Sequence, residues 1–129
     1  MEQYRVNPEQ DPHIVNLRPL IESGLDDILP QLIEIFLETA PRTIELARKA
    51  LEDSQAEELS KAAHSLRGSC SNFGAERLRE LCARLDDVGR IGSLQGAPEL
   101  FESVEKEFVR VRAELLFHLE RIAEINDSR

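Results

Sequence analysis

Residues 62–75 read AAHSLRGSCSNFGA, and this stretch gives the clearest indication of how the chain folds. At about 100° per residue, its apolar side chains and one just before it fall within one third of a helix circumference. These side chains are Leu59, Ala62, Ala63, Leu66, Cys70 and Phe73. His64 lies about 160° from Leu66, on the outer face of the same helix. The stretch therefore predicts an amphipathic helix that buries one stripe and presents a histidine to solvent.

The same three-four spacing of apolar residues predicts three more long helices. One runs from about residue 25 to 51; its apolar phase continues across Pro41, so we expect one kinked helix rather than two. The others run from just after Gly74 to Val88 and from Pro98 to about residue 125, and a short helix is expected at residues 17–23. No segment shows sustained period-two alternation. The fold class is therefore all-α: an antiparallel up-and-down four-helix bundle in residues 17–126 with a short extra N-terminal helix, preceded by a flexible arm at residues 1–16.

Local signals predict where these helices begin and end. Ser54 and Glu57 have the spacing of a capping box, which places the start of the His64 helix there. Gly74 can take the left-handed conformation just past the end of that helix. Gly89 is expected to close the next one. So short a connection at Gly74 requires the two helices to form an antiparallel hairpin.

The composition limits the classes of function. With 129 residues and 41% hydrophobic content, the chain is of ordinary single-domain size, and it has no apolar run long enough to span a membrane and no secretory leader. We therefore expect a cytoplasmic protein. The net charge of −9 argues against nucleic acid or an anionic membrane as a partner. Between residues 60 and 84, however, five basic residues stand against two acidic ones, so the surroundings of His64 are basic.

Other reactive residues in the sequence favour structural roles. Cys70 and Cys82 lie on predicted apolar faces and are interpreted as core residues rather than a disulfide. The three histidines are far apart and no Glu-x-x-His pair is present, so no metal site is expected. His118 borders the apolar stripe of the last helix and is interpreted as a partly buried structural residue.

The residues around His64 carry a family resemblance. His64-x-Leu66-Arg67-Gly68-Ser69, followed by Phe73-Gly74-Ala75, Leu78 and Cys82, resembles the histidine-containing phosphotransfer (Hpt) domain, and the match extends loosely over residues 29–122. The resemblance implies that His64 carries phosphate as phosphohistidine, that Arg67 neutralises the phosphate, and that Gly68 leaves room for it. The family more often has Lys at the position of Arg67. The charge is retained, but a guanidinium is planar and makes different contacts.

Asp86 is the candidate for orienting the His64 ring. The family commonly supplies a Gln or Glu from the following helix to hold the second ring nitrogen, and Asp86 stands at that position with a side chain one methylene shorter. Two alternatives remain open at this point. Asp86 either orients His64 through water or is an ordinary solvated helix carboxylate that does not act on the ring.

The resemblance leads to a specific functional hypothesis. The chain is expected to be a phosphorelay intermediate: His64 accepts a phosphoryl group from the aspartyl phosphate of one receiver domain and passes it to the Asp of another. The partners implied are receiver domains of response regulators or hybrid histidine kinases. The chain is expected to be a monomer, and these partners are expected to dock over a surface that includes Lys61, Ser71, Arg77 and Arg84.

No cofactor is expected on the chain itself, since Mg²⁺ comes with the receiver. No autonomous kinase activity is expected either, because a Gly-rich nucleotide lid is absent. The alternative from another class is a helical adaptor or scaffold in which His64 is incidental.

Overall fold

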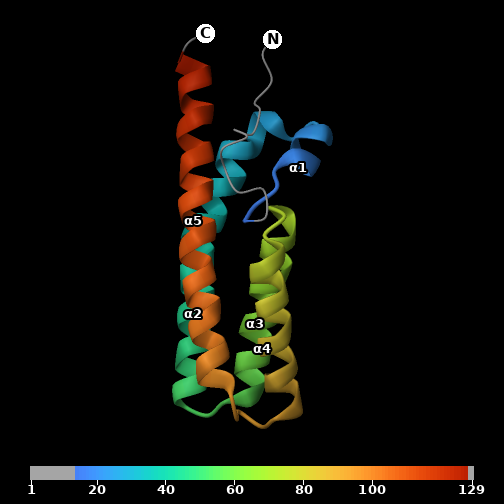
Figure 1. Ribbon diagram of the computed structural model, residues 1–129, viewed down its shortest axis with the longest axis vertical. Coiled ribbons are helices and arrows are strands. Elements are labelled where there is room, and N and C mark those ends of the chain that lie inside the picture. The colour runs from blue at the N-terminus through green and yellow to red at the C-terminus, as the bar shows by residue number, and fades with distance from the viewer. Residues whose placement is uncertain (1–13, 128–129) are drawn as a thin grey trace.

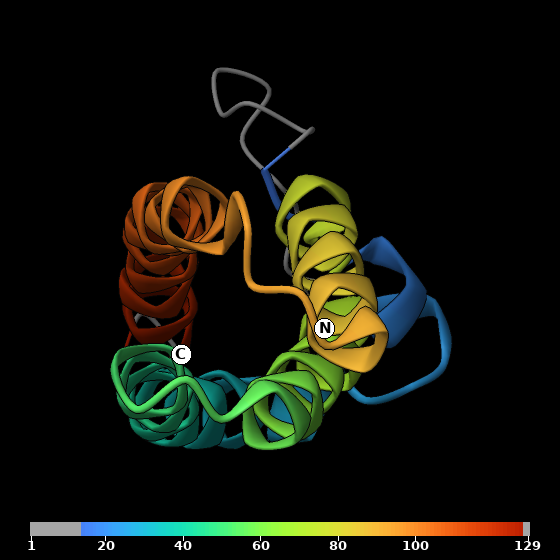
Figure 2. The same cartoon turned by 90° about the horizontal axis from the view of Figure 1, so that it is seen from below.

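The computed structural model describes residues 14–127, and within that range it contains helices and no strand. The helices are α1 (Arg18–Glu22), a 3₁₀ turn η1 (Asp26–Ile28), α2 (Leu29–Glu52), α3 (Ala56–Asn72), α4 (Glu76–Ile91) and α5 (Ala97–Asp127). Four of these are long, and they run alternately up and down (Figure 1). Seen along the bundle, they follow one another around a ring in the order α2, α3, α4, α5 (Figure 2). The predicted four-helix bundle with a short N-terminal helix is confirmed.

The core is aliphatic, as the composition predicts, with a small aromatic cluster near the end of α3. The rings of Phe36 on α2 and Phe73 just after α3 lie 5.0 Å apart between centroids. Fully buried aliphatic side chains come from all parts of the bundle: Leu17, Leu29, Ile33, Leu59, Leu78, Leu85, Val104, Val111 and Leu115. His118 is also buried, with 1% of its surface exposed, more deeply than the partial burial predicted for it.

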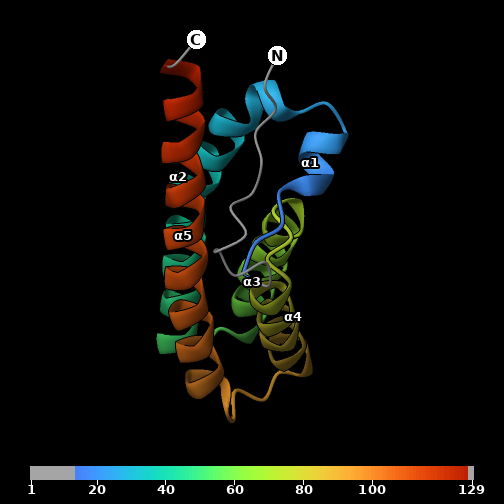
Figure 3. The ribbon, with the colours of Figure 1, turned by 45° about the horizontal axis from the view of Figure 1, so that its top comes forward.

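The segment before α1 belongs to the folded core, which corrects one predicted boundary. Ile14 and Val15, assigned by sequence to a flexible arm, are 8% and 3% exposed and pack into the hydrophobic core. The backbone N–H of Asn16 donates to the carbonyl oxygen of Phe73 at 2.7 Å. This segment therefore ties the chain start to the α3–α4 turn, and α1 lies at that end of the bundle (Figure 3). The predicted arm at residues 1–13 lies outside the described residues.

Gly74 is required in the α3–α4 turn for two reasons. Its φ is +62°, the left-handed conformation that the sequence predicts for this position. A Cβ atom at Gly74 would also come within 2.7 Å of the Asn16 Cβ. Glycine thus lets the N-terminal segment approach the turn while the chain reverses into α4.

Helix α2 continues through Pro41, as the unbroken apolar phase predicts. Pro41 lies on the exposed side of the helix, where water can satisfy the carbonyl group that a proline leaves without a partner. The helix begins four residues later than expected because residues 26–28 form the η1 turn.

The predicted capping box at Ser54 is wrong. Helix α3 begins after Gln55 with no side-chain capping hydrogen bond. Ser54 has φ +55°, and the N–H of Gln55 donates to the carbonyl of Ala50, so these residues close α2 instead of opening α3. A short reversal between two antiparallel helices needs a left-handed residue, and that requirement overrides the capping preference.

The predicted end of α4 at Gly89 is also wrong. The helix continues to Ile91 and is closed by Gly92, whose φ is +87°. Gly89 is inside the helix and buried; a Cβ there would lie 2.7 Å from the Ala56 carbonyl oxygen and 2.8 Å from the Ser60 nitrogen. Gly89 therefore serves as a close contact between α3 and α4. In residues 14–127, no helix is long and apolar enough to cross a membrane.

Candidate functional site

His64 projects from the middle of α3 toward solvent. The buried stripe of that helix turns the opposite face outward, and 66% of the His64 side chain is exposed. The sequence-based expectation of an outward-facing histidine therefore agrees with its placement in the structure.

The imidazole contacts its neighbours in α3 and α4 through Nδ1. The Asp86 Oδ2 atom on α4 lies 3.5 Å from Nδ1, and an Arg67 guanidinium nitrogen lies 3.3 Å from it. Within residues 14–127, no hydrogen bond or ion pair involves Nε2. The ring is thus held through Nδ1 and offers Nε2 to an approaching molecule.

Asp86 is buried rather than solvated, so the second of the two alternatives for this residue is wrong. Its side chain is 3% exposed. Ser60 Oγ on α3 donates a 2.5 Å hydrogen bond to Oδ1, and the Nε atom of Arg90 lies 3.5 Å from the same oxygen. The carboxylate therefore sits between the two helices, with one oxygen held and the other facing His64.

Gly89 explains how a side chain as short as Asp reaches the ring. Its missing Cβ lets the α4 backbone approach that of α3 next to Ser60, one turn from Asp86. With the helices this close, no longer side chain is needed to span the gap. Local sequence rules place Gly89 at a helix end, and they give no sign of this close contact between helices.

Arg67 and Gly68 lie beside His64 as the helical spacing predicts. Arg67 is half-buried, and Gly68, one turn after His64, is exposed. A Cβ atom added at Gly68 would meet no atom within 4 Å. Space next to the ring is therefore open, and a cationic guanidinium borders it.

Two of the four predicted docking residues share α3 with His64. Lys61 is exposed and pairs with Glu57 and Glu58, at 3.8 and 3.4 Å. Ser71 donates its hydroxyl to the Arg67 carbonyl oxygen at 3.2 Å, which uses the hydroxyl proton inside the helix. Of these two residues, only Lys61 adds a positive charge near the histidine.

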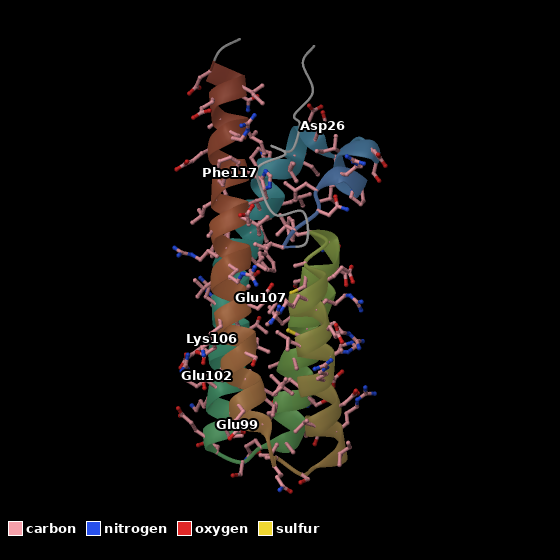
Figure 4. All side chains as sticks on the ribbon, viewed as in Figure 1. Asp26, Glu99, Glu102, Lys106, Glu107 and Phe117 are labelled. Carbon is pink, nitrogen blue, oxygen red and sulfur yellow. The ribbon has the colours of Figure 1, made fainter. Side chains whose placement is uncertain are left out.

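The other two predicted docking residues lie away from His64. Around α4 they stand about 180° (Arg77) and 160° (Arg84) from Asp86. Arg77 Nε lies 3.7 Å from an oxygen of the buried Glu107 on α5, and Figure 4 shows Glu107 on the side of α5 that faces α4. Arg84 pairs with Glu80 on its own helix at 2.9 Å. The structure therefore separates these two arginines from the site.

Sequence reasoning missed the two partners of Asp86. Arg90 follows Asp86 by four residues, a spacing that brings opposite charges together on a helix and gave a usable signal. Nothing in the sequence singles out Ser60. Its contact with Asp86 crosses between helices and depends on their register, which the sequence does not reveal.

A groove between α2 and α3 adjoins the histidine. Its volume is about 400 Å³, and its lining includes Leu46 and Ala50 from α2 and Lys61, Ala62 and Ser65 from α3. Leu46 is 64% exposed, so the groove presents an apolar side chain to solvent at its edge. Lys61 and Ser65 flank His64 in sequence and stand about 60° and 100° from it around α3, so the groove lies beside the face that carries the imidazole.

The two cysteines are unreactive neighbours in the core. Both are buried free thiols on facing helices. Hydrogen bonding to Cys82, together with burial, raises the pKa of the Cys70 thiol. Among residues 14–127, no group of three His, Cys, Asp or Glu side chains has the arrangement of a metal site.

Comparison with known proteins identifies relatives over most of the chain. The sequence profile of a family described as Hpt domain matches residues 31–115. Histidine-containing phosphotransfer protein 2 of Arabidopsis thaliana is 24% identical over 116 residues, which cover 86% of this chain and 74% of the relative. A phosphorelay intermediate protein of Candida albicans is 25% identical over 97 residues, covering 75% of this chain and 48% of the relative. The crystal structure of histidine-containing phosphotransfer protein B from Pseudomonas aeruginosa superposes with a TM-score of 0.80 at 31% identity, covering 87% of this chain and 98% of that one.

Proposed function

The chain belongs to the Hpt domain family and is a histidine phosphotransfer intermediate of multistep phosphorelays, and from that premise we propose that His64 is its phosphoacceptor. Members of this family shuttle a phosphoryl group on histidine and are not kinases. The observation that carries the proposal is the one-sided anchoring of a largely exposed ring: Asp86 and Arg67 both contact Nδ1, while no hydrogen bond or ion pair within residues 14–127 involves Nε2. A nucleophile must be both oriented and accessible, and His64 meets both conditions.

The transfer step follows from this geometry. With its proton on Nδ1, donated toward Asp86, the neutral imidazole has its lone pair on Nε2. That lone pair attacks the phosphorus of a receiver's aspartyl phosphate; the N–P bond forms, the P–O bond breaks, and the receiver carboxylate leaves with the electron pair. The ring then carries a positive charge, which the Asp86 carboxylate beside Nδ1 stabilises. The reverse sequence of events passes the phosphoryl group to a second receiver.

Arg67 and Gly68 are proposed to serve the phosphoryl group. The guanidinium borders the open space beside the ring and can turn toward a phosphoryl oxygen. Gly68 leaves that space empty, since a longer side chain one turn away would occupy it.

Receiver domains are the proposed partners, and we place their docking surface on the α2–α3 side of His64. This side carries Lys61, the exposed Leu46 and the groove next to it. Arg77 and Arg84, which face away, are no longer part of the proposed surface. The divalent ion of the reaction is expected on the receiver. We also propose that residues 14–126 form one folding unit, which extends the predicted domain boundary to include the buried Ile14.

The test is the intact mass of the protein after incubation with a phosphorylated receiver domain. We expect one added phosphoryl group that is labile in acid and stable in base, as an N–P bond requires. His64→Gln should abolish the addition. His13→Gln, which replaces a histidine outside the described residues, is the matched control and should accept phosphate normally.

The result that would refute the assignment is equally definite. If His64→Gln accepted phosphate at the wild-type rate, or if the added phosphate survived acid, the phosphoacceptor would be another residue. Circular dichroism of both variants should match the wild type, because His64 is exposed and supports no core contact.

A further inference from the structure

We propose that Ser60 and Arg90 are positioning residues that keep Asp86 an ionised hydrogen-bond acceptor and so fix His64 in the tautomer that leaves Nε2 unprotonated. The inference deepens the proposed function and rests on it, because it assigns roles around the same histidine. Within residues 14–127, no hydrogen bond or ion pair joins either residue to His64, and both act through Asp86.

The contacts divide the two oxygens of the carboxylate between two tasks. Oδ1 accepts the 2.5 Å hydrogen bond from Ser60 Oγ and lies 3.5 Å from Arg90 Nε. Oδ2 lies 3.5 Å from Nδ1 of His64. Holding Oδ1 from two sides prevents the carboxyl group from rotating, so Oδ2 stays directed at the ring.

The ionisation state of Asp86 decides which tautomer His64 adopts. An ionised carboxylate can only accept, so its partner Nδ1 must carry the proton and Nε2 keeps the lone pair. A neutral carboxyl group could instead donate to Nδ1, which would leave the proton on Nε2 and block attack. The hydroxyl donor of Ser60 and the positive charge of Arg90 both lie against Oδ1, where each favours a carboxylate that accepts.

Arg67 makes this control necessary. A guanidinium can only donate, so its contact with Nδ1 as a hydrogen bond requires Nδ1 to be unprotonated. Arg67 and Asp86 therefore favour opposite tautomers of the same ring. An Asp86 that is anchored and charged wins this competition, and it leaves the guanidinium available for the phosphoryl group.

The experiment measures the His64 tautomer directly by long-range ¹H–¹⁵N NMR on the unphosphorylated protein, at a pH where the ring is neutral. Wild type should show mainly the Nδ1–H form. In Ser60→Ala and in Arg90→Gln the Nε2–H form should increase, and the ratio of tautomers should change about tenfold, as expected for loss of one charge-assisted hydrogen bond. Arg90→Lys keeps a cation at this position and should restore most of the wild-type ratio.

Arg84→Gln is the matched control. Arg84 also pairs with a carboxylate four residues earlier on α4, at 2.9 Å, but it faces away from Asp86. Its replacement should leave the tautomer ratio and the rate of phosphoryl transfer unchanged. The rate in Ser60→Ala and Arg90→Gln should fall in proportion to the fraction of the Nδ1–H form.

The outcomes are distinguishable from failure of the proposed function. An unchanged tautomer ratio in folded Ser60→Ala and Arg90→Gln would overturn the inference, whatever the transfer rates. If either variant failed to fold, the tautomer ratio of His64 would be measured in Asp86→Asn, which has the same size. Its amide can turn a donor toward Nδ1, so the Nε2–H form should increase. A wild-type ratio in Asp86→Asn would also overturn the inference. A shifted ratio in a protein that never accepts phosphate on His64 would support the positioning network and refute the phosphoacceptor assignment alone.

Discussion

Two helical glycines beside the site should respond in opposite ways to the same substitution. Gly68 is within α3 and Gly89 is within α4. Helix propensity alone predicts that alanine stabilises either helix by about 1 kcal/mol. At Gly68 a Cβ meets nothing within 4 Å, so Gly68→Ala should realise that gain. At Gly89 it would lie 2.7 Å from the Ala56 carbonyl oxygen and 2.8 Å from the Ser60 nitrogen.

The magnitude for Gly89 follows from what the new methyl group would strike. These two neighbours are backbone atoms that cannot rotate away, so the two helices must separate. Overpacking of this kind costs about 1–3 kcal/mol, and we place Gly89 in the upper half of that range. After the gain in propensity, the net loss is about 1–2 kcal/mol. For a domain of this size 1 kcal/mol corresponds to about 4 °C in Tm. Gly68→Ala should therefore melt about 4 °C higher than wild type and Gly89→Ala about 4–8 °C lower.

Thermal and urea unfolding followed by far-UV circular dichroism measures both values. Transfer kinetics give a second readout, because separating α3 from α4 would also withdraw Asp86 from His64 and slow phosphoryl acceptance in Gly89→Ala. If Gly89→Ala were stabilised as much as Gly68→Ala, the close approach of the two helices, and with it the explanation of how Asp86 reaches the ring, would be refuted.

Three further predictions concern other parts of the chain. Ser54→Gly should stabilise the protein by about 1 kcal/mol in urea unfolding because glycine tolerates the φ of +55°; no gain would argue against the left-handed conformation. Burial, with a smaller effect of Arg121, lowers the pKa of His118 to about 4. As the pH falls from about 6.5 to 4, only the unfolded chain binds the proton, so the free energy of unfolding should fall by up to about 3 kcal/mol. Urea titrations of His118→Gln over that range should lack this loss, and an equal loss would contradict the prediction. Leu46→Glu should slow transfer from a receiver without lowering stability. Val109→Glu changes an equally exposed residue on α5 and should leave both the transfer rate and the stability unchanged. Equal transfer rates in the two variants would place the docking surface elsewhere.

The helices were predictable because apolar periodicity is set by burial along one face, and burial is what stabilises a bundle. Pro41 illustrates the strength of that signal. Its local preference is to interrupt a helix, yet the apolar phase on both sides of it is continuous, and α2 runs through it with the proline on the exposed face. The outward position of His64 followed from the same periodicity.

The details that were wrong depend on contacts between segments far apart in sequence. Ser54 has the sequence context of a helix start, but the reversal from α2 to α3 requires it to adopt a left-handed conformation. Ile14 and Val15 follow a polar stretch with two prolines, but they are buried by packing on the bundle. Composition and local propensity contain no information about such partners.

Gly89 and Asp86 show why the site was harder to predict than the fold. A glycine followed by a basic residue and a loop is a reasonable helix end by local rules, and an aspartate on a helix is usually solvated. Each interpretation fails because of the other residue: the glycine brings the two helices together, and the short spacing buries the carboxylate against Ser60 and His64. A longer side chain at position 86 would have to fold back in the same space. The identity of the orienting residue and the distance between the helices must therefore change together, so a family pattern that gives only the residue type cannot say whether the shorter side chain reaches the ring.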